Sequence, residues 1–164
     1  MLFRSRVTGH GSRVTGHGLR VTGYGLRKSL VAFQSFESLG VWKRSSRLAV
    51  KVYQALANCR DFGLKDQMTR AAVSIPSNIA EGYERGTNKE FLRYLNIAKG
   101  SASELRTQLY IAKEIGVISA ETMSELVEET KGVSGMLRNL AKARANRTGE
   151  NDNLPTPNAL NTES

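Results

Sequence analysis

Residues 70–86 read RAAVSIPSNIAEGYERG, a stretch that places Pro76 inside the pattern of an amphipathic helix. Its apolar residues recur at spacings of three and four, which is the period of one helix face: Ile75, Ile79, Ala80 and Tyr83. An interior proline costs about 3 kcal/mol or more, because it removes a backbone hydrogen bond and clashes with the preceding turn. The stretch therefore predicts a helix that is kinked at Pro76, or a new segment that starts there.

Three short polar side chains flank this proline, namely Ser74, Ser77 and Asn78. Such side chains can hydrogen-bond the backbone groups that a proline leaves without a partner. We therefore interpret the proline as a specified part of the helix and not as an accidental interruption.

The same three-four periodicity predicts helices of about 20 to 27 residues over residues 39–58, 64–86, 87–116 and 119–145. No segment shows the strict alternation of a half-buried strand. The connections between these predicted helices are no longer than about five residues, and helices joined by such short connections run as antiparallel neighbours. The sequence predicts an all-α, antiparallel up-and-down four-helix bundle whose second helix is kinked at Pro76.

Residues typical of helix ends support these limits. Ser38 and Ser119 are candidate N-caps, and Thr87 begins a capping box. Gly86 suits the left-handed C-cap of the second helix, and Gly116 closes the third.

Charge and composition divide the chain into a central domain, residues 35–147, and two flanking segments, residues 1–34 and 148–164. Residues 6–26 hold three tandem heptads that begin Arg-Val-Thr-Gly, with two glycines in every seven residues. Because such a composition disfavours an ordered helix or strand, we expect residues 1–34 to be disordered, or to be a translated DNA repeat that is no part of the natural protein. The tail is rich in Asn, Thr and Pro and is also expected to be disordered.

The composition also limits the class of protein. The net charge of +9 over 164 residues favours contact with nucleic acid or another acidic surface. A lone cysteine, Cys59, excludes an intramolecular disulfide framework and fits a reducing, cytoplasmic compartment. No apolar run approaches the ~20 residues of a membrane span. Both histidines, His10 and His17, lie in the glycine-rich repeat without a cysteine or carboxylate nearby, so we expect no metal and no cofactor.

A basic stripe follows the outer face of the first predicted helix and consists of Lys43, Arg44, Arg47 and Lys51. Like charges at four-residue spacing repel modestly, so these side chains should face solvent, an acidic neighbour or phosphates. They are the candidate nucleic-acid-binding residues of the chain.

A polar ribbon lies beside the apolar face of the second helix, and similar residues interrupt the third. The set comprises Arg70, Ser74, Asn78 and Glu81, with Gly100, Ser101 and Glu104. A glycine in mid-helix costs about 1 kcal/mol against alanine. Such a cost is usually offset by a close helix approach, either within the subunit or across a subunit boundary. Catalysis, a contact between subunits, and repair of the backbone around Pro76 are the three explanations. Two carboxylates and an arginine without a cysteine, histidine or metal cluster form no recognisable mechanism, so we expect no enzyme.

The run SIPSNIAEG, followed about twenty residues later by Ala98-Lys99-Gly100-Ser101 and Glu104-Leu105, resembles the 23S rRNA intervening-sequence proteins. The resemblance covers residues 36–143. It implies a small four-helix bundle that assembles as a homopentamer. The family is similar to the accessory variability determinant of diversity-generating retroelements, a basic pentameric barrel that binds nucleic acid and a reverse transcriptase. The residues that match the motif are then implied to support subunit packing and the helix break: Arg70, Ser74, Pro76, Ser77, Asn78, Glu81, Gly100, Ser101 and Glu104.

Two functions of different classes remain open from the sequence. The first is a non-catalytic homo-oligomer that binds rRNA, other RNA, DNA or a ribonucleoprotein, with a reverse transcriptase as a further candidate partner. The second is a protein-interaction or scaffold module whose affinity for nucleic acid is incidental to its charge.

Overall fold

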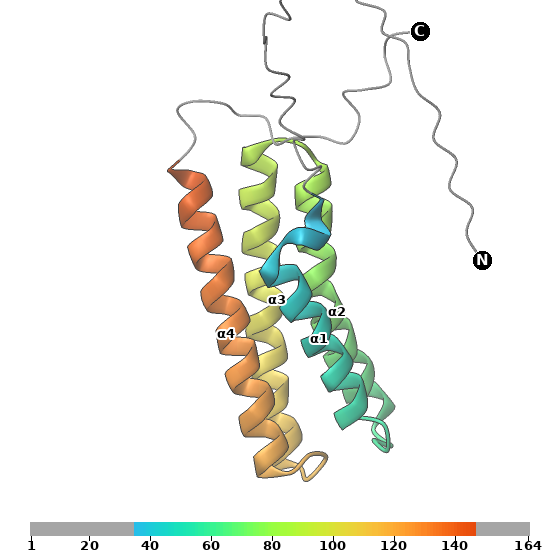
Figure 1. The fold of residues 1–164 in the computed structure, drawn as a ribbon. Coiled ribbons are helices and arrows are strands. Elements are labelled where there is room, and N and C mark those ends of the chain that lie inside the picture. The colour runs from blue at the N-terminus through green and yellow to red at the C-terminus, as the bar shows by residue number, and fades with distance from the viewer. Residues whose placement is uncertain (1–34, 147–164) are drawn as a thin grey trace, which may run out of the picture. The chain divides into compact units, whose positions relative to one another are not determined.

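The computed structural model describes residues 35–146, which form four helices after a short 3-10 turn, η1 (Phe36–Ser38). The helices are α1 (Gly40–Ala55), α2 (Phe62–Glu84), α3 (Asn88–Glu114) and α4 (Ala120–Ala145). Consecutive helices run in opposite directions, and each contacts the two helices beside it (Figure 1). Within residues 35–146 there is no strand, so the predicted all-α bundle is confirmed. The predictions for residues 1–34 and 148–164 lie outside the described part.

The end of α2, both ends of α3 and the start of α4 lie at the cap residues that the sequence predicts. Thr87 and Ser119 accept backbone hydrogen bonds from Glu90 and Thr122 at 3.2 and 3.1 Å and so cap the two helices. Gly86 and Gly116 adopt the left-handed conformation, with φ of 75° and 76°. Glycine reaches this conformation without a Cβ penalty. Their left-handed conformation, just after α2 and α3, confirms both glycines as helix ends.

The starts of α1 and α2 differ from the prediction. Ser38 belongs to η1, and Leu39, which has no side-chain cap bond, is the N-cap of α1. The α2 helix begins at Phe62, two residues before the predicted Leu64, because the side chain of Asp61 accepts the Leu64 amide at 3.0 Å. An aspartate at this position satisfies an otherwise unpaired helix donor.

Pro76 is buried inside α2, which continues through it without interruption. It therefore does not start a new segment. The hydroxyl of Ser77 donates to the carbonyl of Val73 at 2.9 Å, and the Asn78 amide donates to the carbonyl of Ser74 at 2.7 Å. These carbonyls are one turn before Ser77 and Asn78, whereas the carbonyl that Pro76 leaves without its helical donor is that of Ala72, for which no side-chain donor is found in residues 35–146.

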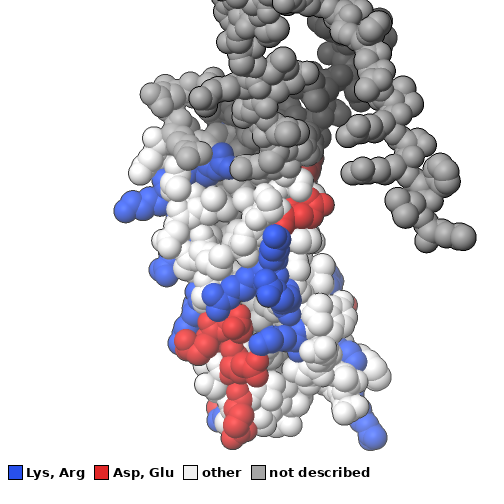
Figure 2. Space-filling view, viewed as in Figure 1, with Lys and Arg blue, Asp and Glu red and all other residues white. Residues whose placement is uncertain are grey.

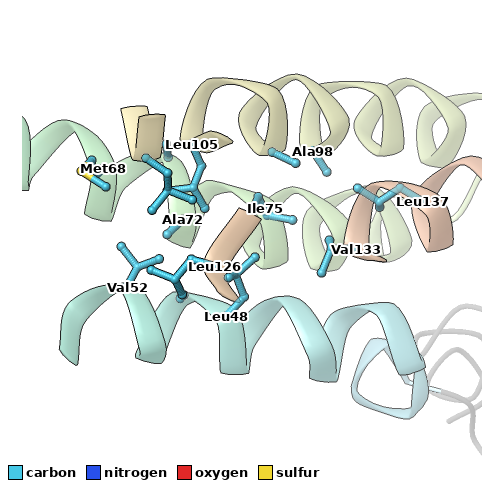
Figure 3. Packing of buried hydrophobic residues seen from close by; sticks show 14 of the residues in the cluster. Leu48, Val52, Met68, Ala72, Ile75, Ala98, Leu105, Leu126, Val133 and Leu137 are labelled. Carbon is cyan, nitrogen blue, oxygen red and sulfur yellow. The ribbon is translucent and has the colours of Figure 1, made fainter. Parts of the chain in front are cut away.

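The core is one apolar cluster to which all four helices contribute (Figure 3). Its largest fully buried side chains include Leu48 and Met68 from α1 and α2, and Phe91 and Leu137 from α3 and α4. Burial of these apolar faces provides the main driving force for folding.

The helices α2 and α3 approach each other closely at Gly82. A Cβ atom placed on Gly82 would lie 2.4 Å from the Cβ of Tyr94. Nothing within residues 35–146 lies within 4 Å of a Cβ placed on Gly100, so of the two alternatives for a close helix approach there, the one within the subunit is excluded and the one across a subunit boundary stays a prediction. Gly82 is therefore the glycine that packing between these two helices requires.

Candidate nucleic-acid interface

The predicted basic stripe lies where α1 faces α4, and two of its four cations form ion pairs across that contact. The Arg44 Nε donates to Glu129 Oε2 at 3.0 Å, and the Lys51 Nζ donates to Glu125 Oε1 at 2.6 Å. An acidic neighbour was one of three alternatives left open by the sequence, and it is correct for Arg44 and Lys51.

Lys43 and Arg47 keep their charges exposed. The Arg47 Nε donates to the backbone carbonyl of Lys43 at 3.2 Å, and neither side chain pairs with a carboxylate within residues 35–146. These two residues therefore present positive charge that forms no ion pair with a carboxylate of residues 35–146, although the charge of Arg47 contributes to the lowered pKa of Glu129.

A groove of about 390 Å³ runs between α1 and α4. Its lining includes Arg44, Arg47 and Lys51, with Glu129 as the one carboxylate among the residues that line it. Figure 2 shows Lys and Arg side chains directly beside Asp and Glu side chains on this face. The surface is thus mixed in charge, with a local excess of cations.

The hydrogen bonds of these ion pairs shift the pKa values of Glu129 and Lys51. The hydrogen bond from Arg44 holds the pKa of Glu129 below its usual value. The hydrogen bond to Glu125 raises the pKa of Lys51. Because these groups are solvent-exposed, their pairing contributes little to stability and leaves the guanidinium and ammonium available to exchange partners.

The absence of a side chain at Gly132 of α4 makes room for the Arg44 guanidinium. The sequence contains no signal for this contact between α1 and α4. A Cβ on Gly132 would lie 2.6 Å from Arg44 Nη2. The missing side chain therefore lets the guanidinium lie against the backbone of α4, close to Glu129.

The predicted polar ribbon is divided into separate contacts, one of which joins α2 to α3. The hydroxyls of Ser74 and Ser101 lie 2.9 Å apart, and the Asn78 amide donates to Ser74 Oγ at 2.9 Å. The three side chains form a small hydrogen-bonded group at the contact between the two helices. Within the chain, these three residues thus join α2 to α3.

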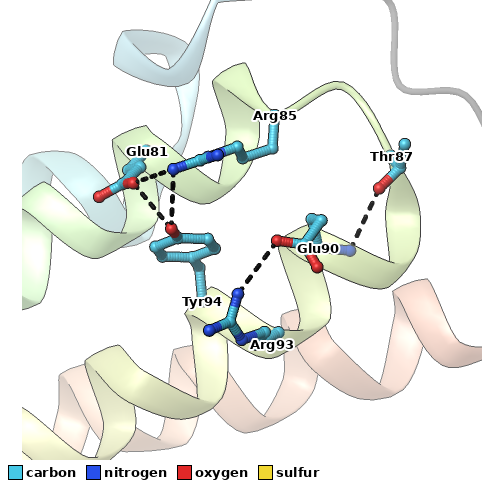
Figure 4. Close-up of polar contacts among 6 residues, drawn as sticks. All are labelled: Glu81, Arg85, Thr87, Glu90, Arg93 and Tyr94. Carbon is cyan, nitrogen blue, oxygen red and sulfur yellow. Dashed lines mark hydrogen bonds and ion pairs between the residues drawn. The ribbon is translucent and has the colours of Figure 1, made fainter.

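Glu81 belongs to a second group, with Arg85 and Tyr94 (Figure 4). Its Oε1 accepts from Arg85 Nη2 at 2.6 Å and from the Tyr94 hydroxyl at 2.7 Å. These bonds, that from Arg85 first, lower the pKa of Glu81, and the bond to Glu81 raises the pKa of Tyr94. Arg85 and Tyr94 were not predicted; Tyr94 lies opposite Gly82, a partner that helix spacing alone does not reveal.

The remaining ribbon residues lie apart from these groups. Arg70 is exposed and pairs with Asp66 at 3.6 Å, one turn earlier on α2. Glu104 accepts from the Gln108 amide at 3.2 Å on α3, and Gly100 is exposed. The predicted set thus does not form one continuous site.

Residues 35–146 contain no group of three or more His, Cys, Asp or Glu side chains able to hold a metal ion. In the same range, no helix has the length and apolar character needed to cross a membrane.

Comparison with known proteins identifies relatives by sequence and by fold. Residues 37–139 match the family described as 23S rRNA-intervening sequence protein. A crystal structure of a protein with unknown function from the S23 ribosomal protein family of Bacteroides thetaiotaomicron superposes with a TM-score of 0.59 at 25% sequence identity. The similarity covers 62% of this chain and 98% of that chain. No curated protein matches the chain in sequence.

Proposed function

This chain belongs to the 23S rRNA-intervening sequence protein family, and we propose that it is a non-catalytic, homo-oligomeric helical bundle that binds RNA or DNA through its basic exterior. The observation that carries the proposal is the α1–α4 groove, which is lined by three cations and one carboxylate. Next to it, Lys43 adds an exposed charge. The family description refers to 23S rRNA, which makes RNA the first ligand to test.

Binding of this kind depends on charge and not on base identity. Contacts to phosphates release condensed counterions, so affinity falls steeply with salt and varies little with sequence. Lys43 and Arg47 can contact a phosphate without giving up an ion pair, whereas Arg44 and Lys51 must exchange theirs.

Reversing the charge of Lys43 and Arg47 in the full chain is expected to weaken RNA binding several-fold. Fluorescence polarisation with a labelled 20-nucleotide single-stranded RNA at 50 mM salt measures the change. A matched control, Arg60→Glu with Lys89→Glu, changes the net charge equally at two exposed positions that contact no carboxylate within residues 35–146. Equal losses in the two variants would show that total charge, and not this face, determines binding.

The ion pairs of Arg44 and Lys51 favour a second candidate, a protein-interaction scaffold, because they give half of the basic stripe a structural role. If this candidate is correct, the variant Lys43→Glu with Arg47→Glu should bind RNA no more weakly than the control variant Arg60→Glu with Lys89→Glu does.

The surface around the Ser74–Ser101 contact is proposed as the seam between copies. Val73 and Ile97, each 40% exposed, are one residue before Ser74 and one turn before Ser101. Gly100 adjoins them and has no neighbour within 4 Å of an added Cβ. Exposed apolar residues beside an open glycine suit close packing against a second copy.

Substituting Gly100 by arginine is therefore expected to dissociate the assembly while the helical content is retained. Within one copy the new side chain has room, whereas in a seam it clashes with the neighbour. Light scattering gives the mass, and circular dichroism gives the helical content. A mass unchanged from that of the wild-type oligomer would place the seam elsewhere.

A further inference from the structure

A second basic groove, distinct from the predicted stripe, lies between α3 and α4 and has a volume of about 190 Å³. Its lining consists of four cations and two hydroxyl residues, without a carboxylate: Lys99, Ser103, Arg106, Lys131, Ser134 and Arg138. None of these six residues belongs to the basic stripe of α1 or to the polar ribbon.

The lining residues occupy one face of each helix. On α3 the spacing is four then three residues, and on α4 it is three then four. Because α3 and α4 are antiparallel neighbours (Figure 1), Lys99 and Arg138 lie toward one end of the groove, and Arg106 and Lys131 lie toward the other. Seven residues of helix separate the two ends, which is about 10 Å.

The cations of this groove are poorly neutralised. Arg106 and Arg138 form no ion pair or side-chain hydrogen bond within residues 35–146. Lys99 donates to the neutral amide oxygen of Asn96 at 3.2 Å. Lys131 pairs with Glu128 at 2.7 Å, a contact exposed on both sides.

Like charges also face each other across the groove. The bond to Glu128 raises the pKa of Lys131, and the nearby charge of Arg106 opposes that rise. An anion bound between Arg106 and Lys131 would relieve this repulsion. In the α1–α4 groove, by contrast, Glu129 lines the wall and repels an incoming anion.

Solvated cations on a helix surface are common, but this groove has three features that an ordinary cationic surface does not combine. Four cations converge on one groove, no carboxylate lines it, and two hydroxyls lie between the cation pairs. The hydroxyl of Ser134 has no hydrogen-bond partner in the described chain, and that of Ser103 donates to the Lys99 carbonyl at 3.1 Å and can still accept. Phosphate oxygens accept hydrogen bonds from arginine, lysine and serine side chains together.

We propose that the α3–α4 groove binds the backbone phosphates of a nucleic-acid strand, with Arg106 and Lys131 at one phosphate and Lys99 and Arg138 at another. The proposal rests on the proposed function and assigns its main contact to α3 and α4, with the α1 face as a secondary contact. Contacts confined to the backbone predict weak sequence preference.

The test uses the full chain, the labelled 20-nucleotide RNA and three variants of equal net charge. Arg106→Glu with Arg138→Glu is expected to lower the association constant at least tenfold, more than Lys43→Glu with Arg47→Glu does. The control, Arg60→Glu with Lys89→Glu, should lower it least. Loss of two phosphate contacts should also reduce the slope of log K against log salt by about 1.4.

Two further variants make the result independent of folding. Arg106→Lys with Arg138→Lys keeps the charges and should retain most of the affinity, whereas Arg106→Gln with Arg138→Gln removes them without introducing repulsion and should lose it. If Arg106→Glu with Arg138→Glu binds like the control while the α1 variant loses affinity, the groove assignment is overturned and the proposed function stands. If the wild-type chain binds neither RNA nor DNA at 50 mM salt, both are overturned.

Discussion

Replacing Phe91 by alanine is expected to lower the free energy of unfolding by about 3–5 kcal/mol. Phe91 is fully buried in the cluster that joins the four helices. Its ring packs edge-on against Tyr83, with centroids 5.8 Å apart, and the Arg144 guanidinium lies 5.4 Å from its centroid. Truncation therefore removes a large apolar area from the core and leaves a cavity that the helices close only in part.

Urea unfolding followed by circular dichroism measures this loss. Phe62→Ala is the matched control, since Phe62 is the first residue of α2 and is 77% exposed. The same chemical change there is expected to alter stability by no more than about 0.5 kcal/mol. Similar losses at the two positions would contradict the placement of Phe91 in the core.

Gly82→Ala is expected to destabilise the bundle by about 1–3 kcal/mol, although alanine is the better helix former. The added Cβ would lie 2.4 Å from the Cβ of Tyr94. Because Tyr94 Cβ is fixed to the backbone of α3, a rotamer change cannot remove the clash, and the two helices must separate. That separation also strains the bonds between Glu81, Arg85 and Tyr94.

The control for Gly82→Ala is a glycine-to-alanine change that is expected to raise the free energy of unfolding. Gly135 lies inside α4, and nothing is within 4 Å of a Cβ placed there. Gly135→Ala should therefore stabilise the protein by about 0.5–1 kcal/mol through helix propensity alone. If both alanine variants are stabilised, α2 and α3 do not approach closely at Gly82.

Properties that depend on one helix could be predicted from the sequence. The three-four spacing of apolar residues indicated four helices, and Thr87, Ser119, Gly86 and Gly116 marked helix ends, because a cap is formed with groups three or four residues away. The start of α2 was placed at Leu64, two residues too late. The Asp61 side chain, which accepts the Leu64 amide, was a signal of the true start.

Properties that depend on two helices could not be predicted in the same way. Helix spacing showed that Arg44 and Lys51 share a face, but their partners Glu129 and Glu125 are 85 and 74 residues away in sequence. The neighbours of a glycine depend likewise on the adjacent helix. This is why the sequence could not say whether Gly100 faces a helix of the same chain, and why the close contact at Gly82 was missed.

The basic groove of α3 and α4 illustrates the same limit. Lys99 and Arg106 are ordinary exposed or half-exposed cations when α3 is considered alone, and so are Lys131 and Arg138 on α4. Only the antiparallel packing of the two helices brings them to one groove. A binding surface built from both helices therefore has no signature in the spacing of either.

The salt dependence of RNA binding by the wild-type full chain tests the central claim most directly. Polarisation titrations with the 20-nucleotide RNA between 50 and 200 mM salt give log K against log salt. If four phosphates are contacted in the α3–α4 and α1–α4 grooves, the plot should be linear with a slope of about −3. No binding at 50 mM salt, or an affinity that does not change with salt, would contradict the claim that this bundle binds nucleic acid through its basic exterior.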